Sequence, residues 1–282
     1  MKCSWDTVIK ILPIHIRKQV DKFSQTVIEE IRLRLHLPPV IITKNAEYDL
    51  EHTITAADLT FCINTASQYS PWSVQTLPQR YITIEGGHRI GIAGNVIYKD
   101  KTPVGINSVY SVCIRIANEF PEVSQKLWQC NGSILIIGKP GSGKTTLLRD
   151  LICQKSNYGT DTICVIDEKR EIFPFYNGSP CFSVGKRSDI ISGCAKSDGI
   201  EIALRNMGPG IIAVDEITAL EDCQALLHAG WCGVDLIASA HAGCRKDLFT
   251  RSVYKPLVES KLFDTLIILD AHKSWHMERM YG

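Results

Sequence analysis

A glycine-rich stretch in the middle of the chain, GKPGSGKTT at residues 138–146, has the residue types and spacing of a phosphate-binding loop. Gly138 to Thr145 fits the pattern G-x-x-x-x-G-K-[ST], in which backbone N–H groups wrap phosphates. In this pattern Lys144 reaches the β- and γ-phosphates of a nucleotide, and the hydroxyl of Thr145 holds Mg²⁺. An ordinary glycine turn is the alternative, but it does not require every position of the pattern to be filled. The residues predicted to bind the nucleotide are Gly138, Lys139, Pro140, Gly141, Ser142, Gly143, Lys144, Thr145 and Thr146.

Two pairs of acidic residues follow apolar runs that are typical of buried strands. Asp215 and Glu216 follow GIIAV, and Asp167 and Glu168 follow ICVI. Beside a phosphate loop, Asp215 can join Thr145 in the Mg²⁺ shell, and a glutamate can polarise water for in-line attack. Either Glu216 or Glu168 could be this base, and a solvated strand end is the structural alternative for both pairs.

Cationic and imidazole side chains complete the predicted catalytic set. His241 follows the apolar run LIASA, where it could sense the γ-phosphate. A cation against the transferring phosphoryl group accelerates hydrolysis by orders of magnitude and often comes from a neighbouring subunit. The candidates for this cation are Arg89, Arg115, Arg170, Arg187 and Arg205.

The elements around these residues indicate an α/β fold. Short apolar runs separated by helical lengths predict a parallel sheet with crossover helices. The predicted strands are 134–137, 162–166, 210–214, 236–240 and 266–270, and the run 145–153 should form the helix after the loop. Ligands bind such sheets beyond the carboxyl ends of the strands, which is where the acidic residues and His241 are placed.

The first part of the chain has a different pattern and predicts a smaller α+β domain. We expect a helical start over residues 5–23, a strand at 39–43, a helix over 56–69 capped by Thr55 or Asp58, and hairpins within 81–117. The pattern changes within residues 118–131, so the predicted domains are 1–125 and 126–282.

Composition narrows the class of protein. The 282 residues carry 31 Lys and Arg against 30 Asp and Glu, so bulk charge gives no support to nucleic-acid binding. Eleven cysteines without a C-x-x-C pair favour a reducing cytoplasm. No apolar run reaches the length of about 18 residues that predicts a membrane span. The gaps between Cys223, His228, Cys232, His241 and Cys244 lack the short paired spacing of structural zinc sites. His272 and His276 are four positions apart and could share a helix face.

These motifs together resemble the bacterial stage III sporulation protein AA family, which is related to the type II and type IV secretion ATPases. The resemblance rests on GKPGSGKTTLLRDL, VIDEKREI, GPGIIAVDEI and ASAHAG in the second half, and on EEIRLRLHLPPVI and YITIEGGHRIGIAGNVI in the first. It implies a RecA-like P-loop core that binds ATP and Mg²⁺ behind an N-terminal domain. The implied motifs are a Walker A loop at Gly138–Thr145, an acidic box at Asp167–Glu168, a Walker B pair at Asp215–Glu216 and a histidine box at His241.

The resemblance further implies a motor that works as a ring. The family implies a hexamer whose Arg89 and Arg115 approach the nucleotide from the N-terminal domain. Its implied partners are membrane proteins of the mother cell–forespore channel complex, on the mother-cell face. The resemblance therefore implies a cytoplasmic, membrane-peripheral ATPase that powers assembly of, or transport through, that complex. A nucleotide-gated scaffold with little turnover, a RecA-like nucleic-acid motor and a small-molecule kinase remain as alternatives.

Overall fold

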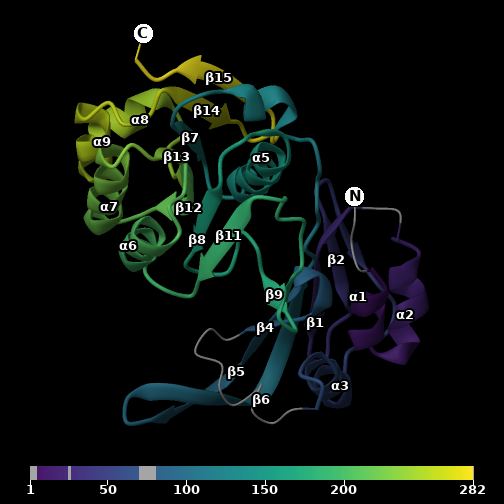
Figure 1. Cartoon of the computed structure of the whole chain (residues 1–282). Helices are drawn as coiled ribbons and strands as arrows, with labels where there is room; N and C mark the ends of the chain where they lie inside the picture. Colours follow the sequence, from purple (N-terminus) through teal and green to yellow (C-terminus); the bar gives the residue numbers. More distant parts are fainter. Residues whose placement is uncertain (1–4, 25–26, 70–80, 282) are drawn as a thin grey trace. The chain divides into compact units, whose positions relative to one another are not determined.

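The chain forms two compact units (Figure 1). The computed structural model describes residues 5–24, 27–69 and 81–281. The first unit is Met1–Glu119 with Phe175–Phe182, and the second is Phe120–Pro174 with Ser183–Gly282. The short segment Phe175–Phe182 therefore belongs to the first unit, although the residues before and after it in the chain belong to the second.

The first unit is built on an antiparallel sheet with strand order β3-β2-β1-β6-β5-β4. Its strands are β1 (Ile28–Arg34), β2 (Val40–Thr43), β3 (Glu47–Asp49), β4 (Tyr81–Thr83), β5 (Arg89–Lys99) and β6 (Thr102–Arg115). Its α-helices are α1 (Trp5–Ile11), α2 (Ile14–Asp21) and α3 (Ala56–Ala66), with a 3₁₀ turn at Glu85–Gly87. A two-stranded hairpin of β9 (Phe175–Tyr176) and β10 (Ser179–Pro180) completes it. One buried cluster joins α1, α2 and α3 to the central strands.

Local chemistry explains where the helices of this unit end. The helical start predicted over residues 5–23 consists of two helices, because Pro13 separates α1 from α2 and a residue before proline is pushed out of the helical region. In α3, Thr55 and Asp58 act together, since the Thr55 hydroxyl accepts from Asp58 N while the Asp58 carboxylate accepts from Thr55 N. Both candidate capping residues are therefore used. The helix ends at Ala66, earlier than the predicted limit.

Replacing Thr55 with alanine is expected to lower the free energy of unfolding by about 1 kcal/mol, because the exposed capping box of α3 is lost. Urea unfolding of the parent and the variant measures this. Thr60→Ala is the matched control, since Thr60 is an exposed threonine of the same helix that bonds only the Ala56 carbonyl within the described contacts. Equal losses in the two variants would contradict the capping role.

The second unit is built on a seven-stranded sheet with order β11-β8-β12-β13-β7-β14-β15, in which every neighbouring pair is parallel except β14 with β15. The strands are β7 (Ile134–Gly138), β8 (Ile163–Asp167), β11 (Ser188–Ser192), β12 (Ile211–Ile217), β13 (Asp235–Ala240), β14 (Thr265–Leu269) and β15 (Trp275–Arg279). The helices are α5 (Lys144–Tyr158), α6 (Lys196–Asn206), α7 (Leu220–Trp231), α8 (Arg245–Thr250) and α9 (Lys255–Glu259), with 3₁₀ turns at Gln125–Gln129 and Ser252–Tyr254. The predicted α/β class with a mostly parallel sheet is confirmed.

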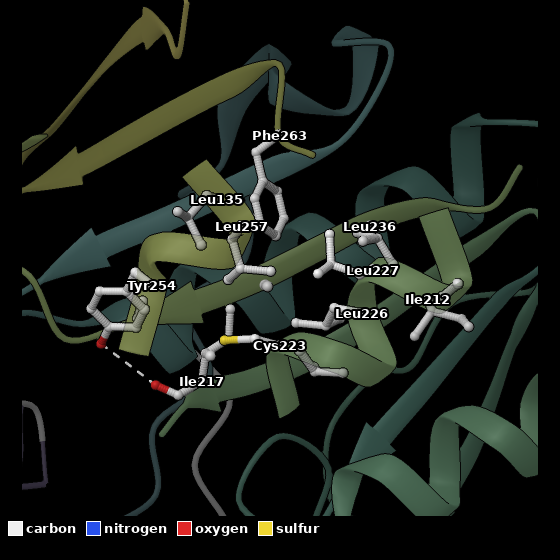
Figure 2. Close-up of a cluster of buried hydrophobic side chains, with 14 of the residues drawn as sticks. Leu135, Ile212, Ile217, Cys223, Leu226, Leu227, Leu236, Tyr254, Leu257 and Phe263 are labelled. Carbon is white, nitrogen blue, oxygen red and sulfur yellow. Dashed lines mark hydrogen bonds between the residues drawn. The ribbon is translucent and has the colours of Figure 1, made fainter. Parts of the chain in front are cut away.

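Burial explains why this sheet forms. Every residue of β7 and β8 is buried, as expected for central parallel strands that are covered on both faces. Helix α5 lies on one side of the sheet and α6 and α7 lie on the other (Figure 1). On the α6–α7 side, Cys223 and Leu226 of α7 pack with Ile212 of β12 and with Phe263 in one cluster (Figure 2).

Two strands of the second unit were not predicted. β11 is a half-buried edge strand, and β15 is a polar, antiparallel edge strand, so neither has a continuous apolar run. The idea that His272 and His276 share a helix face is wrong, because His276 lies in β15 and His272 in the turn before it.

Candidate active site

The phosphate-binding pattern forms a loop between β7 and α5, as its strand–loop–helix context requires. Gly141 and Gly143 have φ of 76° and 99°, in the left-handed region that favours glycine. At Gly138 a Cβ atom would lie 2.4 Å from Ser142 Oγ, so a side chain does not fit there. The Ser142 hydroxyl is buried, and no hydrogen-bond partner for it occurs in the described part of the chain. A loop of this shape with an unsatisfied polar group suits an anion at the N-terminus of α5.

Lys144 is the first residue of α5 and its ammonium group lies inside the loop. The residue is only 6% exposed. Its Nζ donates to the carbonyl oxygens of Gly138 at 3.1 Å and Lys139 at 3.2 Å, and lies 2.9 Å from Nδ1 of His241. Burial lowers the pKa of Lys144, and the carboxylates of Asp215 and Glu216 oppose that effect. The lysine and the histidine predicted to face the nucleotide are thus brought together.

Asp215 lies near the carboxyl end of β12 and faces the loop. The Thr145 hydroxyl donates to Oδ2 of Asp215 at 2.8 Å, and the Ser239 hydroxyl donates to its Oδ1. Mg²⁺ takes oxygen ligands and is usually held by one or two carboxylates together with substrate phosphates. The carboxylate and hydroxyl therefore fit the metal predicted for them.

Glu216 adopts a left-handed backbone conformation, with φ of 48°. The β12–β13 register shifts between Val214 and Ile217, so the residues between them leave the regular ladder. The Glu216 carboxylate contacts His241 Nε2 and lies 3.6 Å from Lys169 Nζ. Burial raises the pKa of Glu216, but His241, Lys169 and Lys144 outweigh it and hold the pKa below its usual range. Lys144, His241 and Glu216 form a continuous row of polar contacts.

The lowered pKa of Glu216 predicts how stability depends on pH. The folded protein binds this proton less readily than the unfolded chain, so the charged carboxylate stabilises the fold above its ordinary pKa of 4.5. That stabilisation should be lost as pH falls through the lowered pKa. The free energy of unfolding of the parent minus that of Glu216→Gln, measured from about pH 7 to pH 3, should therefore decrease. A difference that stays constant over this range would contradict the pairing.

The acidic residues of β8 have partners of their own. Asp167 is 2% exposed, and its carboxylate accepts from the backbone N–H groups of Glu171 at 2.7 Å and Phe173 at 2.8 Å. Burial raises the pKa of Asp167 despite these bonds. Glu168 accepts from Nζ of the buried Lys196 at 2.6 Å. Asp167 therefore shapes the loop after β8, while Glu168 is neutralised by a lysine.

The two arginines implied by the family resemblance lie in the first unit. Arg89 and Arg115 face each other across the β5–β6 ladder. The Arg89 guanidinium lies 4.8 Å from the centre of the Tyr81 ring, and Arg115 Nε lies 3.2 Å from Glu30 Oε1. Both arginines belong to the first unit, and the phosphate loop belongs to the second.

The other candidate arginines make local contacts in the second unit. Arg187 donates to the Ser156 carbonyl at 3.1 Å, and Arg205 pairs with Glu201 at 2.5 Å on α6. Arg170 has a φ of 56°, and its amide bonds the Asp167 carbonyl at 3.2 Å.

Three residues close to the predicted site were missed. They are Ser239, Lys169 and Lys196. The serine inside the apolar run LIASA could have been noticed in the sequence, whereas the two lysines are not part of any recognisable motif.

Within residues 5–24, 27–69 and 81–281, no group of three or more His, Cys, Asp or Glu side chains could hold a metal. The same residues include no helix long and apolar enough to cross a membrane.

The parallel sheet, its phosphate loop and the acidic strand ends define a P-loop NTPase fold with a RecA-like core. Among the solved structures that share this fold are two ATPases or motors. The Legionella pneumophila ATPase DotB aligns with a TM-score of 0.64 and 15% identity, covering 95% of this chain and 80% of DotB. The pilus retraction motor PilT with bound ADP aligns with a TM-score of 0.62 and 16% identity, covering 89% of this chain and 76% of PilT.

Within that class, the chain belongs to the family Sporulation stage III, protein AA, which residues 4–281 match. Stage III sporulation protein AA of Bacillus subtilis is 34% identical over 283 aligned positions, covering 94% of this chain and 91% of the relative. The predicted family resemblance is confirmed.

Proposed function

We propose that the chain is a Mg²⁺-dependent ATPase whose site is the row of contacts from Lys144 through His241 to Glu216. The observation that carries the proposal is this row, together with the Thr145–Asp215 contact, at the carboxyl edge of a parallel sheet. Ligands bind at this edge in open α/β sheets. A cation, an imidazole and a carboxylate placed together beside a phosphate loop are suited to phosphoryl transfer to water.

Each side chain has a distinct role in this proposal. Lys144 would exchange its bonds with the Gly138 and Lys139 carbonyls for bonds with the β- and γ-phosphates. Thr145 and Asp215 would hold Mg²⁺, which when bound neutralises charge on the phosphate oxygens. Glu216 would orient the attacking water, and His241, in contact with both Lys144 and Glu216, would sense the state of the γ-phosphate.

Glu216 is a better candidate for the base than Glu168. A base must be ionised and free to accept a proton from water. The pKa of Glu216 lies below its ordinary value, so the carboxylate is ionised, and its contacts are with His241 and, at 3.6 Å, with the half-exposed Lys169. Glu168 instead makes a 2.6 Å contact with a lysine that is 4% exposed. Releasing Glu168 would leave Lys196 buried with only Asp222, at 3.7 Å, as its described ion-pair partner.

At the level of assembly, we propose a hexameric ring that works as a motor. Membership of the sporulation family and a fold shared with the PilT motor support this. Residues 1–125 and 126–282 would be its domains, and Arg89 or Arg115 would act on the nucleotide of a neighbouring subunit. The motor would bind membrane proteins of the mother cell–forespore channel from the mother-cell cytoplasm, and power assembly of, or transport through, that channel.

The ring predicts that ATP hydrolysis per chain rises with protein concentration, because each site would need a residue from its neighbour. The rate of phosphate release should be measured together with the mass in solution by light scattering. The rate and the mass should rise over the same range of concentration. A rate per chain that stays constant while the mass changes would contradict a shared site and leave the ATPase proposal standing.

A further inference from the structure

The hydroxyl of Ser239 lies at the break in the sheet that carries Asp215 and Glu216. Ser239 belongs to β13, which runs between β7, the strand of the phosphate loop, and β12, the strand of the two acids. Val214 pairs with Ala238 and Ile217 pairs with Ala240. Asp215 and Glu216 of β12 therefore lie opposite one residue of β13, Ser239. This is the arrangement of a β-bulge, a feature that redirects side chains next to active sites.

The Ser239 hydroxyl uses both its donor and its acceptor capacity at this bulge. It donates to Oδ1 of Asp215 and accepts from the backbone N–H of Glu216 at 2.9 Å. The side chain is 0% exposed, so water does not replace these bonds. The Glu216 amide has left the regular ladder and depends on this hydroxyl, while the residue keeps a left-handed φ of 48°. One serine thus holds the side chain of one acid and the backbone of the next.

We propose that Ser239 is a positioning residue that orients Asp215 toward the metal and directs Glu216 toward the attacking water. The inference rests on the proposed function. Thr145 is the other hydroxyl on Asp215, bonding Oδ2, and in the proposed function it turns to the metal. Ser239 then remains as the fixed donor to Asp215. Residues that orient metal ligands in this way contribute about 10- to 100-fold to metal affinity or activity.

The test compares Ser239→Ala with Ser133→Ala in the full chain. Ser133 is a matched control because it is also buried, and its hydroxyl accepts from Leu236 N at 3.0 Å near the opposite end of β13. Binding of a fluorescent ATP analogue is titrated with Mg²⁺ and repeated in chelator. We expect Ser239→Ala to raise the half-saturating Mg²⁺ concentration by about tenfold or more and to leave binding in chelator unchanged. Ser133→Ala should leave both quantities unchanged.

A second readout needs no nucleotide. Hydrogen exchange of the Glu216 amide should become faster in Ser239→Ala, because this variant loses the hydroxyl that accepts from that amide. It should stay unchanged in Ser133→Ala, which loses the acceptor of the Leu236 amide instead. Unchanged Mg²⁺ dependence in Ser239→Ala, or equal changes in both variants, would overturn the inference. Phosphate release is measured separately, so a chain that binds the analogue in a Mg²⁺- and Ser239-dependent way without hydrolysis would refute the ATPase proposal alone. A chain that binds no nucleotide would refute both.

Discussion

Replacing Lys144 with alanine is expected to weaken ATP binding by about 10- to 100-fold, since hydrogen bonds to charged groups contribute about 1.5–3 kcal/mol. Hydrolysis should fall further, by about 1,000-fold or more, which is the effect of removing a cation from the transferring phosphoryl group. The reason is the position of Nζ, which lies among the loop carbonyls and beside His241. Equilibrium binding of an ATP analogue and phosphate release measure the two effects.

Lys139→Ala is the matched control for this variant. Lys139 belongs to the same loop, where its backbone N–H is the predicted nucleotide contact, and alanine keeps that group. Its side chain is exposed, whereas that of Lys144 is buried. Removing it takes away the same charge without removing a group from inside the loop, so binding and hydrolysis should stay close to those of the parent. If both variants lost binding equally, the effect would be one of net charge near the loop rather than of the Lys144 position.

Glu216→Gln is expected to slow hydrolysis by about 10²–10⁴-fold while ATP still binds, because an amide cannot accept the proton of the attacking water. Glutamine has nearly the same size, so contacts with His241 can persist. The rate should be measured in single-turnover phosphate release at saturating ATP. Glu221→Gln serves as the control, since Glu221 is an exposed glutamate of the same unit.

Glu168→Gln separates the two candidate bases. It should retain most hydrolysis and instead lower the free energy of unfolding, because Lys196 would lose a 2.6 Å partner in a buried position. A larger loss of rate in Glu168→Gln than in Glu216→Gln would show that Glu168, after β8, is the base. If neither variant changed the phenotype of sporulating cells while ATP binding remained essential, the chain would act as a nucleotide-gated scaffold.

The parts of the fold that follow from local sequence patterns could be predicted. The phosphate loop needs glycines at Gly141 and Gly143, where φ is positive, and such a requirement is visible in the sequence. Continuous apolar runs also identified the central strands, because both faces of those strands are buried. The edge strands β11 and β15 escaped prediction because one side of an edge is open and their residues do not form such runs.

The contacts that distinguish the acidic residues could not be predicted, because they depend on residues far apart in the chain. Glu216 and Glu168 each follow an aspartate at the end of an apolar run, so their patterns are the same. They differ through His241 and Lys196, which lie 25 and 28 positions away in the sequence. The bulge at Asp215 and Glu216 likewise depends on the pairing of β12 with β13, and the order of strands in the sheet cannot be read from the sequence.

The most direct test of the ATPase proposal is steady-state phosphate release by the full chain from ATP, with Mg²⁺ or with chelator, over a range of protein concentrations. Lys144→Ala, purified in the same way, controls for contaminating ATPases. The proposal predicts release that requires Mg²⁺ and disappears in Lys144→Ala. Release that is absent at every concentration, or that is as fast in Lys144→Ala as in the parent, would contradict it.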